Sequence, residues 1–299
     1  MNKLNFFFGA ALAIATVVAC DPAEEGPKDF PIKGEFSLYA EGVTAADAGV
    51  FVTSEGVMQA NLAYTVAEGE GAVALTAVGE KAGFKQGQHT IYAYAPYAET
   101  AAELASIPMP DYSVQATEAY DPYADIEGLA GLMITYASVA APFQVAVAEV
   151  AEYSSAAITL PFESAVALTT VEVMEYGLEG DGADAVVGKK VSKIVVSADA
   201  PIAIKNATYN FDEKKVTSEE SNSIEIAASY EIYKMYAVSG SGFTFKSTAS
   251  ADVLKAAKVK IEVYLEDGSV FAAEDLTVST SYMDENALMI AGLGLSKVK

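Results

Sequence analysis

The sequence KVKIEVYLEDGSVFAAEDLTV, residues 258–278, decides the fold class of this 299-residue chain. Apolar and polar residues alternate on both sides of Asp267-Gly268, and this period of two is typical of strands with one buried face. An Asp-Gly pair readily adopts the positive φ angles of a tight turn between antiparallel strands. The stretch therefore predicts a β-hairpin.

Segments of the same kind recur along most of the chain. Short runs rich in Val, Ile, Tyr and Thr are separated by Gly, Asp, Asn and Pro, with no rhythm of strands and long helices. This pattern predicts an all-β protein built of sandwiches. A polar, Gly-rich stretch at 177–188 predicts a boundary between a first β-sandwich at 34–180 and a second at 189–299. The Ala-rich segments 98–106 and 124–131 are predicted to form short helices.

The composition indicates a folded, strongly acidic protein. The net charge is −23, 52% of the residues are hydrophobic, and the mean hydropathy is +0.25. This hydrophobic content excludes a disordered chain. The acidity excludes nucleic acid as a partner, because binding phosphates requires a basic face. All 18 basic residues are lysines, so the chain has no arginine, and it has no tryptophan.

The only cysteine, Cys20, follows a short apolar run from Phe6 to Ala19. This run is shorter than the roughly 20 residues of a membrane-spanning helix and suits a secretory signal. Its end, VVAC, is typical of a bacterial lipoprotein. We therefore predict a signal peptide at 1–19, cleaved between Ala19 and Cys20. An ordinary signal peptide with an incidental cysteine is the alternative.

Lipidation of Cys20 would place the protein at the cell surface. Two or more acyl chains, palmitate among them, give stable anchoring where one gives only marginal binding. We therefore expect the mature protein to be held at the cell outer membrane, with residues 20–33 as an acidic linker before the first sandwich.

No motif of catalytic, metal or cofactor chemistry stands out. His89, the only histidine, lies at the entrance to a strand-like run. The sequence has no G-x-S-x-G motif to supply a catalytic serine as its partner, so we expect His89 to be a solvent-facing residue at a strand edge. Phosphate-binding, dinucleotide-binding and EF-hand motifs are absent from the sequence. The sequence predicts a protein that is not an enzyme, with no catalytic residue, no metal site and no cofactor.

The order of several segments is more informative than any single motif. A strand IYAYAPYAE (91–99) is followed by a Ser-Val-Gln stretch between Tyr112 and Ala116, by GLMITYASV (131–139) and by ITLPFESAVALTTVEV (158–173). This order resembles the fimbrillin family, the subunits and anchors of type V pili in Gram-negative anaerobes. Gly131 and Glu163 depart from it, since the family favours Asp and His there.

The resemblance implies two tandem transthyretin-like β-sandwich domains and a structural role in a fimbria that mediates cell adhesion. In the stalk subunits of that family an arginine-specific protease cuts in the first strand or its loop, and the C-terminal strand of a neighbour fills the groove left by the lost strand. Other pilus subunits, paired head to tail, are then the expected partners. Here the first strand would be GEFSLYA (34–40). The donor candidate is ENALMIAGLGLSKVK (285–299), which could equally be a plain last strand of the second sandwich.

The absence of arginine leaves the processing step open. Either another protease acts, with Lys28 and Lys33 as candidate sites, or the first strand is retained. A chain that keeps its first strand would be an anchor or a surface protein that does not polymerise. A glycan-binding surface lipoprotein is the alternative function, although sugar sites usually recruit tryptophan. A host or bacterial surface ligand is a further candidate partner.

Overall fold

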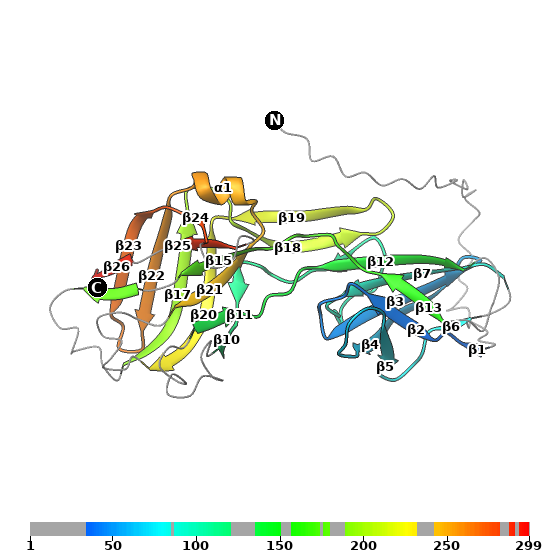
Figure 1. Ribbon diagram of the computed structural model, residues 1–299. Helices are drawn as coiled ribbons and strands as arrows, with labels where there is room; N and C mark the ends of the chain where they lie inside the picture. Colours follow the sequence, from blue (N-terminus) through cyan, green and yellow to red (C-terminus); the bar gives the residue numbers. More distant parts are fainter. Residues whose placement is uncertain are drawn as a thin grey trace.

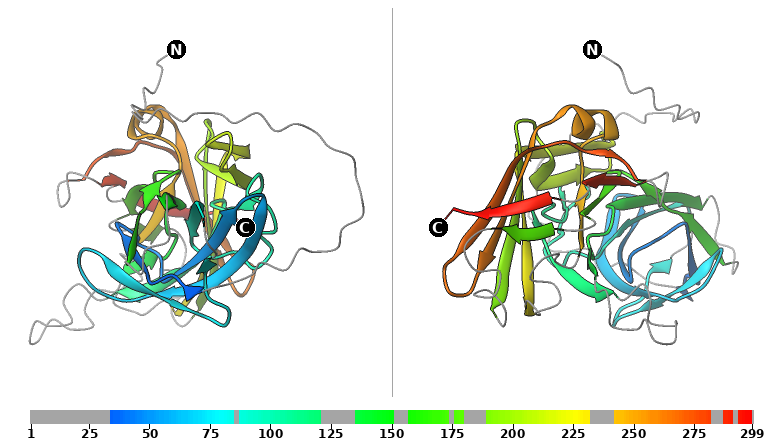
Figure 2. Two further views of the ribbon diagram at one scale, coloured as in Figure 1. Left: turned by 90° about the vertical axis from the view of Figure 1, so that its right-hand side faces the viewer. Right: turned by 60° about the vertical axis from the view of Figure 1, so that its left-hand side comes forward.

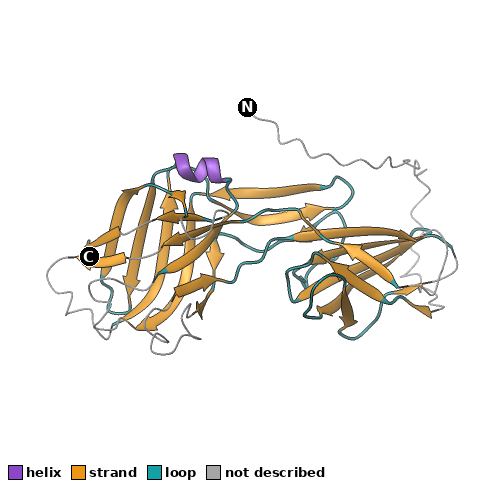
Figure 3. Ribbon diagram, viewed as in Figure 1, coloured by secondary structure: helices purple, strands orange, loops and turns teal. Residues whose placement is uncertain are grey.

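The computed structural model describes residues 34–84, 87–120, 135–150, 157–173, 176–179, 189–231, 242–281, 287–290 and 293–298. These residues are almost entirely β, with one short helix (Figure 3). The predicted all-β fold is therefore confirmed. The predicted cleavage site, lipidation site and lysine processing sites lie outside the described residues: Ala19, Cys20, Lys28 and Lys33.

The first sandwich is a single sheet that wraps around one core. Its strands lie in the order β13, β2, β5, β4, β3, β7, β12, β14, with bounds β2 Leu38–Glu41, β3 Asp47–Ser54, β4 Val57–Val66, β5 Val73–Ala77, β7 His89–Ala95, β12 Gln144–Val150, β13 Ile158–Pro161 and β14 Glu163–Ser164. A small extra pair, β1 (Gly34–Glu35) and β6 (Gly83–Phe84), lies beside it. Viewed nearly end-on, this unit is rounded (Figure 2). One cluster of buried side chains from seven of the strands fills it.

The second sandwich consists of two facing sheets. The seven-stranded sheet has the order β16 Tyr176–Glu179, β26 Leu293–Lys297, β23 Val270–Leu276, β22 Val259–Leu265, β17 Lys190–Ala198, β20 Ser223–Glu231 and β9 Val114–Gln115. The six-stranded sheet has the order β10 Thr117–Tyr120, β11 Thr135–Ser138, β21 Phe243–Ser247, β15 Thr169–Val173, β25 Leu288–Ile290 and β24 Ser279–Thr280.

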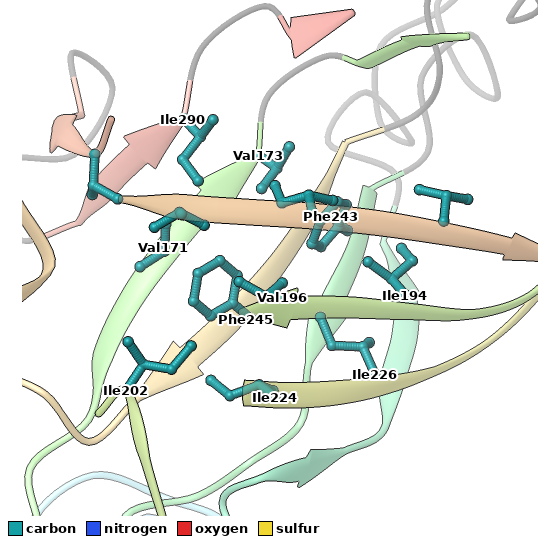
Figure 4. Close-up of a cluster of buried hydrophobic side chains, with 14 of the residues drawn as sticks. Val171, Val173, Ile194, Val196, Ile202, Ile224, Ile226, Phe243, Phe245 and Ile290 are labelled. Atoms are coloured by element: carbon teal, nitrogen blue, oxygen red, sulfur yellow. The ribbon is translucent and has the colours of Figure 1, made fainter. Parts of the chain in front are cut away.

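The core of the second sandwich lies between these two sheets. Phe245 of β21 and Val171 of β15 face Val196 of β17 and Ile224 of β20 (Figure 4). In β22 alternate residues point inward, and these are Val259, Ile261, Val263 and Leu265. This is the period of two that the sequence shows.

An arm connects the two sandwiches. The hairpin of β18 (Ala203–Asn210) and β19 (Lys215–Ser221) leaves the second sandwich between β17 and β20 and extends over the first (Figure 1). The short strand β8 (Ile107–Pro108) pairs with β18, so the chain segment that crosses from the first sandwich to the second runs along the arm.

The strand pairing divides the described residues differently from the predicted ranges 34–180 and 189–299. Strands β9, β11, β15 and β16 fall within the range predicted for the first sandwich, yet they pair with β20, β21, β25 and β26 of the second. Strand β10 pairs with β11 at the edge of the same sheet. The chain crosses to the second sandwich before β9, returns to the first for β12–β14, and crosses again before β15. Most of the predicted boundary, residues 180–188, lies outside the described residues.

Among the local predictions, the hairpin is confirmed and one of the two short helices is wrong. The hairpin at 258–278 is confirmed as β22 and β23, with Gly268 at a φ of +85° and its N–H donating to the Leu265 carbonyl over 3.0 Å. The helix predicted at 98–106 is wrong, since that segment consists of turns and irregular backbone, and the one predicted at 124–131 lies outside the described residues. The described helix is α1 (Ala251–Ala256), which begins after Ser250 as the N-terminal cap.

His89 is a further correction. It is fully buried and lies edge-on to Phe36, with ring centroids 5.5 Å apart. Its parity along β7 explains this, because His89 shares the inward face with Ile91 and Ala93. Its burial beneath Phe36 gives it a place in the core of the first sandwich.

Candidate functional site around the first strand

The first strand of the large sheet, β2, lies inside that sheet. On one side β2 pairs in parallel with β13 over four residue pairs, from Leu38↔Ile158 to Glu41↔Pro161. On the other side it pairs antiparallel with β5, but only at Tyr39↔Ala74 and Ala40↔Val73. Strand β2, near the start of the folded chain, thus lies between β13, which comes much later in the sequence, and β5, which follows it more closely. Its removal would open the sheet.

The side chains of this segment belong to the core. Phe36, Leu38 and Ala40 alternate along the strand and are 7%, 3% and 0% exposed. They pack in the buried cluster of the first sandwich. Fully burying a Leu or Phe side chain contributes about 1.5–3 kcal/mol. The segment is therefore held by packing as well as by its hydrogen bonds.

The beginning of the segment turns away from β5. The Phe36 N–H donates to the Ala82 carbonyl over 2.9 Å, and β1 pairs with β6 rather than with β5. The Phe36 ring lies 5.3 Å from the ring of Phe84, between centroids. These contacts draw the chain toward β6, so β2 and β5 diverge at this end.

A slot opens where the two strands diverge. It has a volume of about 350 Å³ and is lined by residues of the first strand, of β4, of β5 and of the segment before β6: Glu35, Phe36, Ser37, Leu38, Tyr39, Tyr64, Ala74, Leu75, Thr76, Ala77 and Lys81. Leu38, Leu75 and the ring of Tyr64 are buried and supply the apolar part. At the rim, Lys81 Nζ and Glu35 Oε2 form an exposed ion pair of 2.9 Å.

Tyr64 adds a polar group to this apolar lining. Its hydroxyl oxygen accepts a hydrogen bond of 2.6 Å from the Ala82 N–H. Burial raises the pKa of the phenol, the Ala82 hydrogen bond lowers it by less, and the nearby Glu35 carboxylate adds a smaller raising effect. The phenol is therefore neutral at physiological pH.

The loop after β2 is fixed to the rest of the sandwich by one side chain. The buried Gln144 amide of β12 donates to the Gly42 carbonyl over 2.7 Å. Its carbonyl oxygen accepts from the Thr44 N–H over 2.8 Å and from the Thr44 hydroxyl over 2.9 Å. Residues 42–44 are thus tied to β12 independently of the strand that precedes them. The sequence offered no signal for this role, because Gln144 is far from the loop along the chain.

The predicted donor segment, 285–299, lies in the second sandwich. Strand β25 pairs with β15, and β26 lies between β16 and β23. Leu288, Met289, Ile290 and Leu295 are buried there. In this chain the described part of the tail forms the last strands of its own sandwich, which agrees with the interpretation of the tail as a plain last strand. To act as a donor, the tail would have to leave this sheet.

The described part of the chain shows no gathering of metal-binding side chains. Within it, no cluster of three or more His, Cys, Asp or Glu could hold a metal ion. No helix among the described residues is long and apolar enough to span a bilayer.

Comparisons with known proteins return solved structures alone. No family model and no curated protein matches the sequence. One similar structure is described as a candidate cell adhesion protein from Bacteroides uniformis, with 16% identity over 90% of this chain and 98% of that chain and a TM-score of 0.46. A fimbrial assembly protein from Parabacteroides distasonis shows 11% identity over 87% of this chain and 90% of that one, with a TM-score of 0.31. A fimbrial protein from Bacteroides vulgatus shows 11% identity over 88% and 95%, with a TM-score of 0.30.

These descriptions name the class of protein that the sequence resembles.

Proposed function

We propose that this chain is a subunit or anchor of a fimbria on the cell surface, and that its first sandwich accepts a strand of another subunit in place of β2. The observation that carries the proposal is the position of β2. It contributes Leu38 and Ala40 to the core and lies between β13 and β5, yet it precedes every other strand of that sheet in the chain. A single cut between β2 and β3 would therefore detach it.

Removal of β2 would create a strong site for an extended partner. Both neighbouring strands would lose hydrogen-bonding partners, and the apolar surface that Phe36, Leu38 and Ala40 cover would meet water. At about 25 cal/mol per Å² of apolar surface, a few hundred Å² corresponds to several kcal/mol. A strand with alternating apolar residues would restore both the pairing and the burial. The Gln144 contacts to Gly42 and Thr44 would hold the new chain end in place.

Anchoring and opening of the groove are separate steps in this proposal. Acyl chains on Cys20 would hold the protein at the outer membrane. A cut at Lys28 or Lys33 would release it from Cys20 but would leave β2 attached, because both lysines precede Gly34. Neither lysine nor arginine occurs between Gly34 and Glu80. Opening the groove would therefore need a protease of another specificity, and a chain that keeps β2 would serve as an anchor with a filled groove.

An engineered cut tests this function. A specific protease site is inserted between Glu41 and Gly42, and the cut protein is incubated with a synthetic peptide of residues 285–299. We expect the fragment ending at Glu41 to stay bound in buffer and to be released as the peptide is captured, as measured by native mass spectrometry.

A peptide of the same composition in scrambled order and the uncut parent protein are the controls. Retention of the fragment with no capture of the ordered peptide would contradict exchange at this position. Capture of both peptides to the same extent would contradict a specific strand site.

A further inference from the structure

The arm carries the longest open strand edge among the described residues. In its sheet, of order β19, β18, β8, strand β19 has seven residues and pairs, within the described part of the chain, with β18 alone. The other edge strands of the described sheets have two to four residues. Strand β19 forms the outer margin of the arm (Figure 1). Its sequence, KVTSEES, has no proline, one of the features by which proteins commonly protect an edge.

The backbone of β19 directs hydrogen-bonding groups to this open side. The Ala207 carbonyl of β18 accepts a hydrogen bond of 2.9 Å from the segment that follows β8, so this residue faces away from β19. Backbone groups alternate in direction along a strand, and Thr208 therefore faces β19, where Thr217 lies opposite. The backbone of Thr217 is thus used by β18, and the N–H and carbonyl groups of Val216 and Ser218 point outward.

One face of the arm holds β19 in its extended form. Val216 packs against the buried cluster that contains Phe211 and joins the arm to the first sandwich. At the tip, the Asn210 side chain accepts hydrogen bonds of 2.8 Å and 2.9 Å from the N–H groups of residues 212 and 213. The edge is therefore already ordered, and a strand that pairs with it meets a preformed partner.

The charges of β19 complement those of a second β19. Lys215, Thr217 and Glu219 alternate along the face opposite to Val216, and all three are exposed. Lys215 and Glu219 form no ion pair among the described residues, although Lys205 of β18 lies opposite Glu219. In an antiparallel pair of β19 strands centred on Thr217, Lys215 of each copy lies opposite Glu219 of the other, whereas a parallel pair would place like charges together.

The edge also lacks the excess negative charge of the rest of the chain. Residues 214–220 contain two lysines and two glutamates, so their charges sum to zero in a chain whose net charge is −23. Two copies therefore meet less electrostatic repulsion along this strand than a surface of average charge would impose.

We propose that two copies of this chain pair edge to edge through β19, antiparallel and with Thr217 of one copy opposite Thr217 of the other. In this register the outward backbone groups of Val216 in one copy bond to those of Ser218 in the other. Cross-strand pairs of Lys215 with Glu219 flank the centre on the exposed face. The same surface is used by both copies, so the contact closes as a dimer.

This contact does not depend on the proposed strand exchange. Strands β2 and β26 take no part in it, and the slot beside β2 stays free. The pairing would therefore join two fimbriae side by side rather than extend one of them. A single strand edge from each copy buries less surface than the roughly 1,200 Å² of a standard interface, so we expect a weak dimer that forms at high protein concentration.

Single cysteines test the register. The whole chain from residue 21 onward contains no cysteine, so a cysteine introduced on β19 can form a disulfide only with a second copy. We expect mild oxidation to cross-link Thr217→Cys, because Cα atoms of directly opposite residues in such a pair lie about 4.5 Å apart, within the range of a disulfide. Ser218→Cys is the matched control. It is exposed on the same strand but lies opposite Val216, and it should cross-link at least about fivefold more slowly.

Reversal of the charges tests the complementarity, with sedimentation equilibrium of the same chain as the measurement. Lys215→Glu and Glu219→Lys each place like charges opposite one another in both pairs, and each should weaken self-association about tenfold. An equimolar mixture of the two variants restores an opposite charge at every pair and should associate like the parent. Circular dichroism and thermal unfolding establish that each variant folds.

Each result decides for or against the pairing. Faster cross-linking of Thr217→Cys than of Ser218→Cys, with association recovered in the mixture, supports it. Preferential cross-linking through Ser218→Cys, or equal slow cross-linking of both, overturns the register and with it the proposal. Dimers that form equally well in both charge variants lie on another surface and overturn it too. None of these outcomes bears on capture of the tail peptide by the chain cut after Glu41, which tests the proposed function separately.

Discussion

The contact between the arm and the first sandwich can be broken at one residue, Phe211, at the tip of the hairpin. Its side chain is 4% exposed and lies edge-on to Tyr92 of β7 and to Tyr209 of β18, with ring centroids 5.3 Å and 5.1 Å away. Tyr209 in turn lies 5.9 Å from Phe143. These side chains belong to one buried cluster that joins β18 to β3 and β7. Phe211→Ala removes the residue that links the arm to Tyr92.

The size of the destabilisation expected for Phe211→Ala follows from the burial of the Phe211 side chain. Replacing a buried Phe by Ala costs about 3–5 kcal/mol, and each well-placed aromatic pair contributes about 0.5–1.5 kcal/mol beyond the area it buries. Because the arm projects from the second sandwich, we expect this loss to weaken docking of the arm and to leave both cores folded. The Phe211 N–H donates to the Leu104 carbonyl and the Met109 N–H to the Ala207 carbonyl, each over 2.9 Å, so these amides report whether the arm is docked.

Hydrogen exchange measured by mass spectrometry provides the assay. In Phe211→Ala the amides of 104–112 and 203–211 should exchange at least tenfold faster, a change that corresponds to about 1.4 kcal/mol, while amides of β3 and β22 keep their protection. Thr217→Ala, an exposed position on β19, is the matched control and should change nothing. Unchanged protection along the arm would refute the reasoning. Simultaneous loss of protection in both sandwiches would show that the arm is not a separate docking element.

Three further predictions concern single side chains. Gln115 is buried, and its carbonyl oxygen accepts from the Ser138 hydroxyl over 2.7 Å and from the Lys246 N–H over 3.0 Å. Gln115→Leu should therefore lower the free energy of unfolding in urea by about 2–4 kcal/mol, because one buried and one half-buried donor lose their acceptor. An unchanged urea midpoint would contradict this. Gly49→Ala should lower the melting temperature, because a Cβ there would overlap the ring of Tyr94. Gly56→Ala is the control: it has open space around it and should lose only the stability that its positive φ costs. Equal decreases in the melting temperature of the two variants would be inconsistent with crowding at Gly49. Cys20→Ser should abolish metabolic labelling with palmitate, and labelling that persists in this variant would refute the lipoprotein interpretation.

Local sequence signals predicted the strands and hairpins well. Asp267-Gly268 with alternating flanks is sufficient for the β22–β23 hairpin, because the turn and the period of two act over neighbouring residues. The burial of His89 also follows a local signal, because His89, Ile91 and Ala93 are alternate residues and therefore share one face of β7. The helix α1 carried a short signal of its own, Ser250 as a cap with Asp252 in the first turn. Six residues are too few for a helical period to show.

The pairing of strands that lie far apart in the chain could not be predicted from the sequence. The sequence of β15 carries no signal that it pairs with β21 and β25 rather than with strands of the first sandwich. The same holds for Gln144, which fixes the loop at Gly42, and for Phe211, which contacts Tyr92. Sequence order divides the chain once, at 177–188. The three-dimensional pairing interleaves the two sandwiches, because several strands can satisfy the same apolar alternation and only the complete packing selects among them.

The separation of the first strand and the tail constrains any assembly that joins them. The slot beside β2 belongs to the first sandwich and β26 to the second, at the two ends of an elongated molecule (Figure 1). A contact between them uses two different surfaces, so a copy whose slot is filled still offers its own tail. Such head-to-tail pairing generates a ring if its rotation closes and a filament if it does not. A copy that keeps β2 and never admits a strand can only donate, and it would stand at one end of the row. If Cys20 is acylated as proposed, keeping those chains at that end would attach the row to the membrane, which is the arrangement an anchor requires.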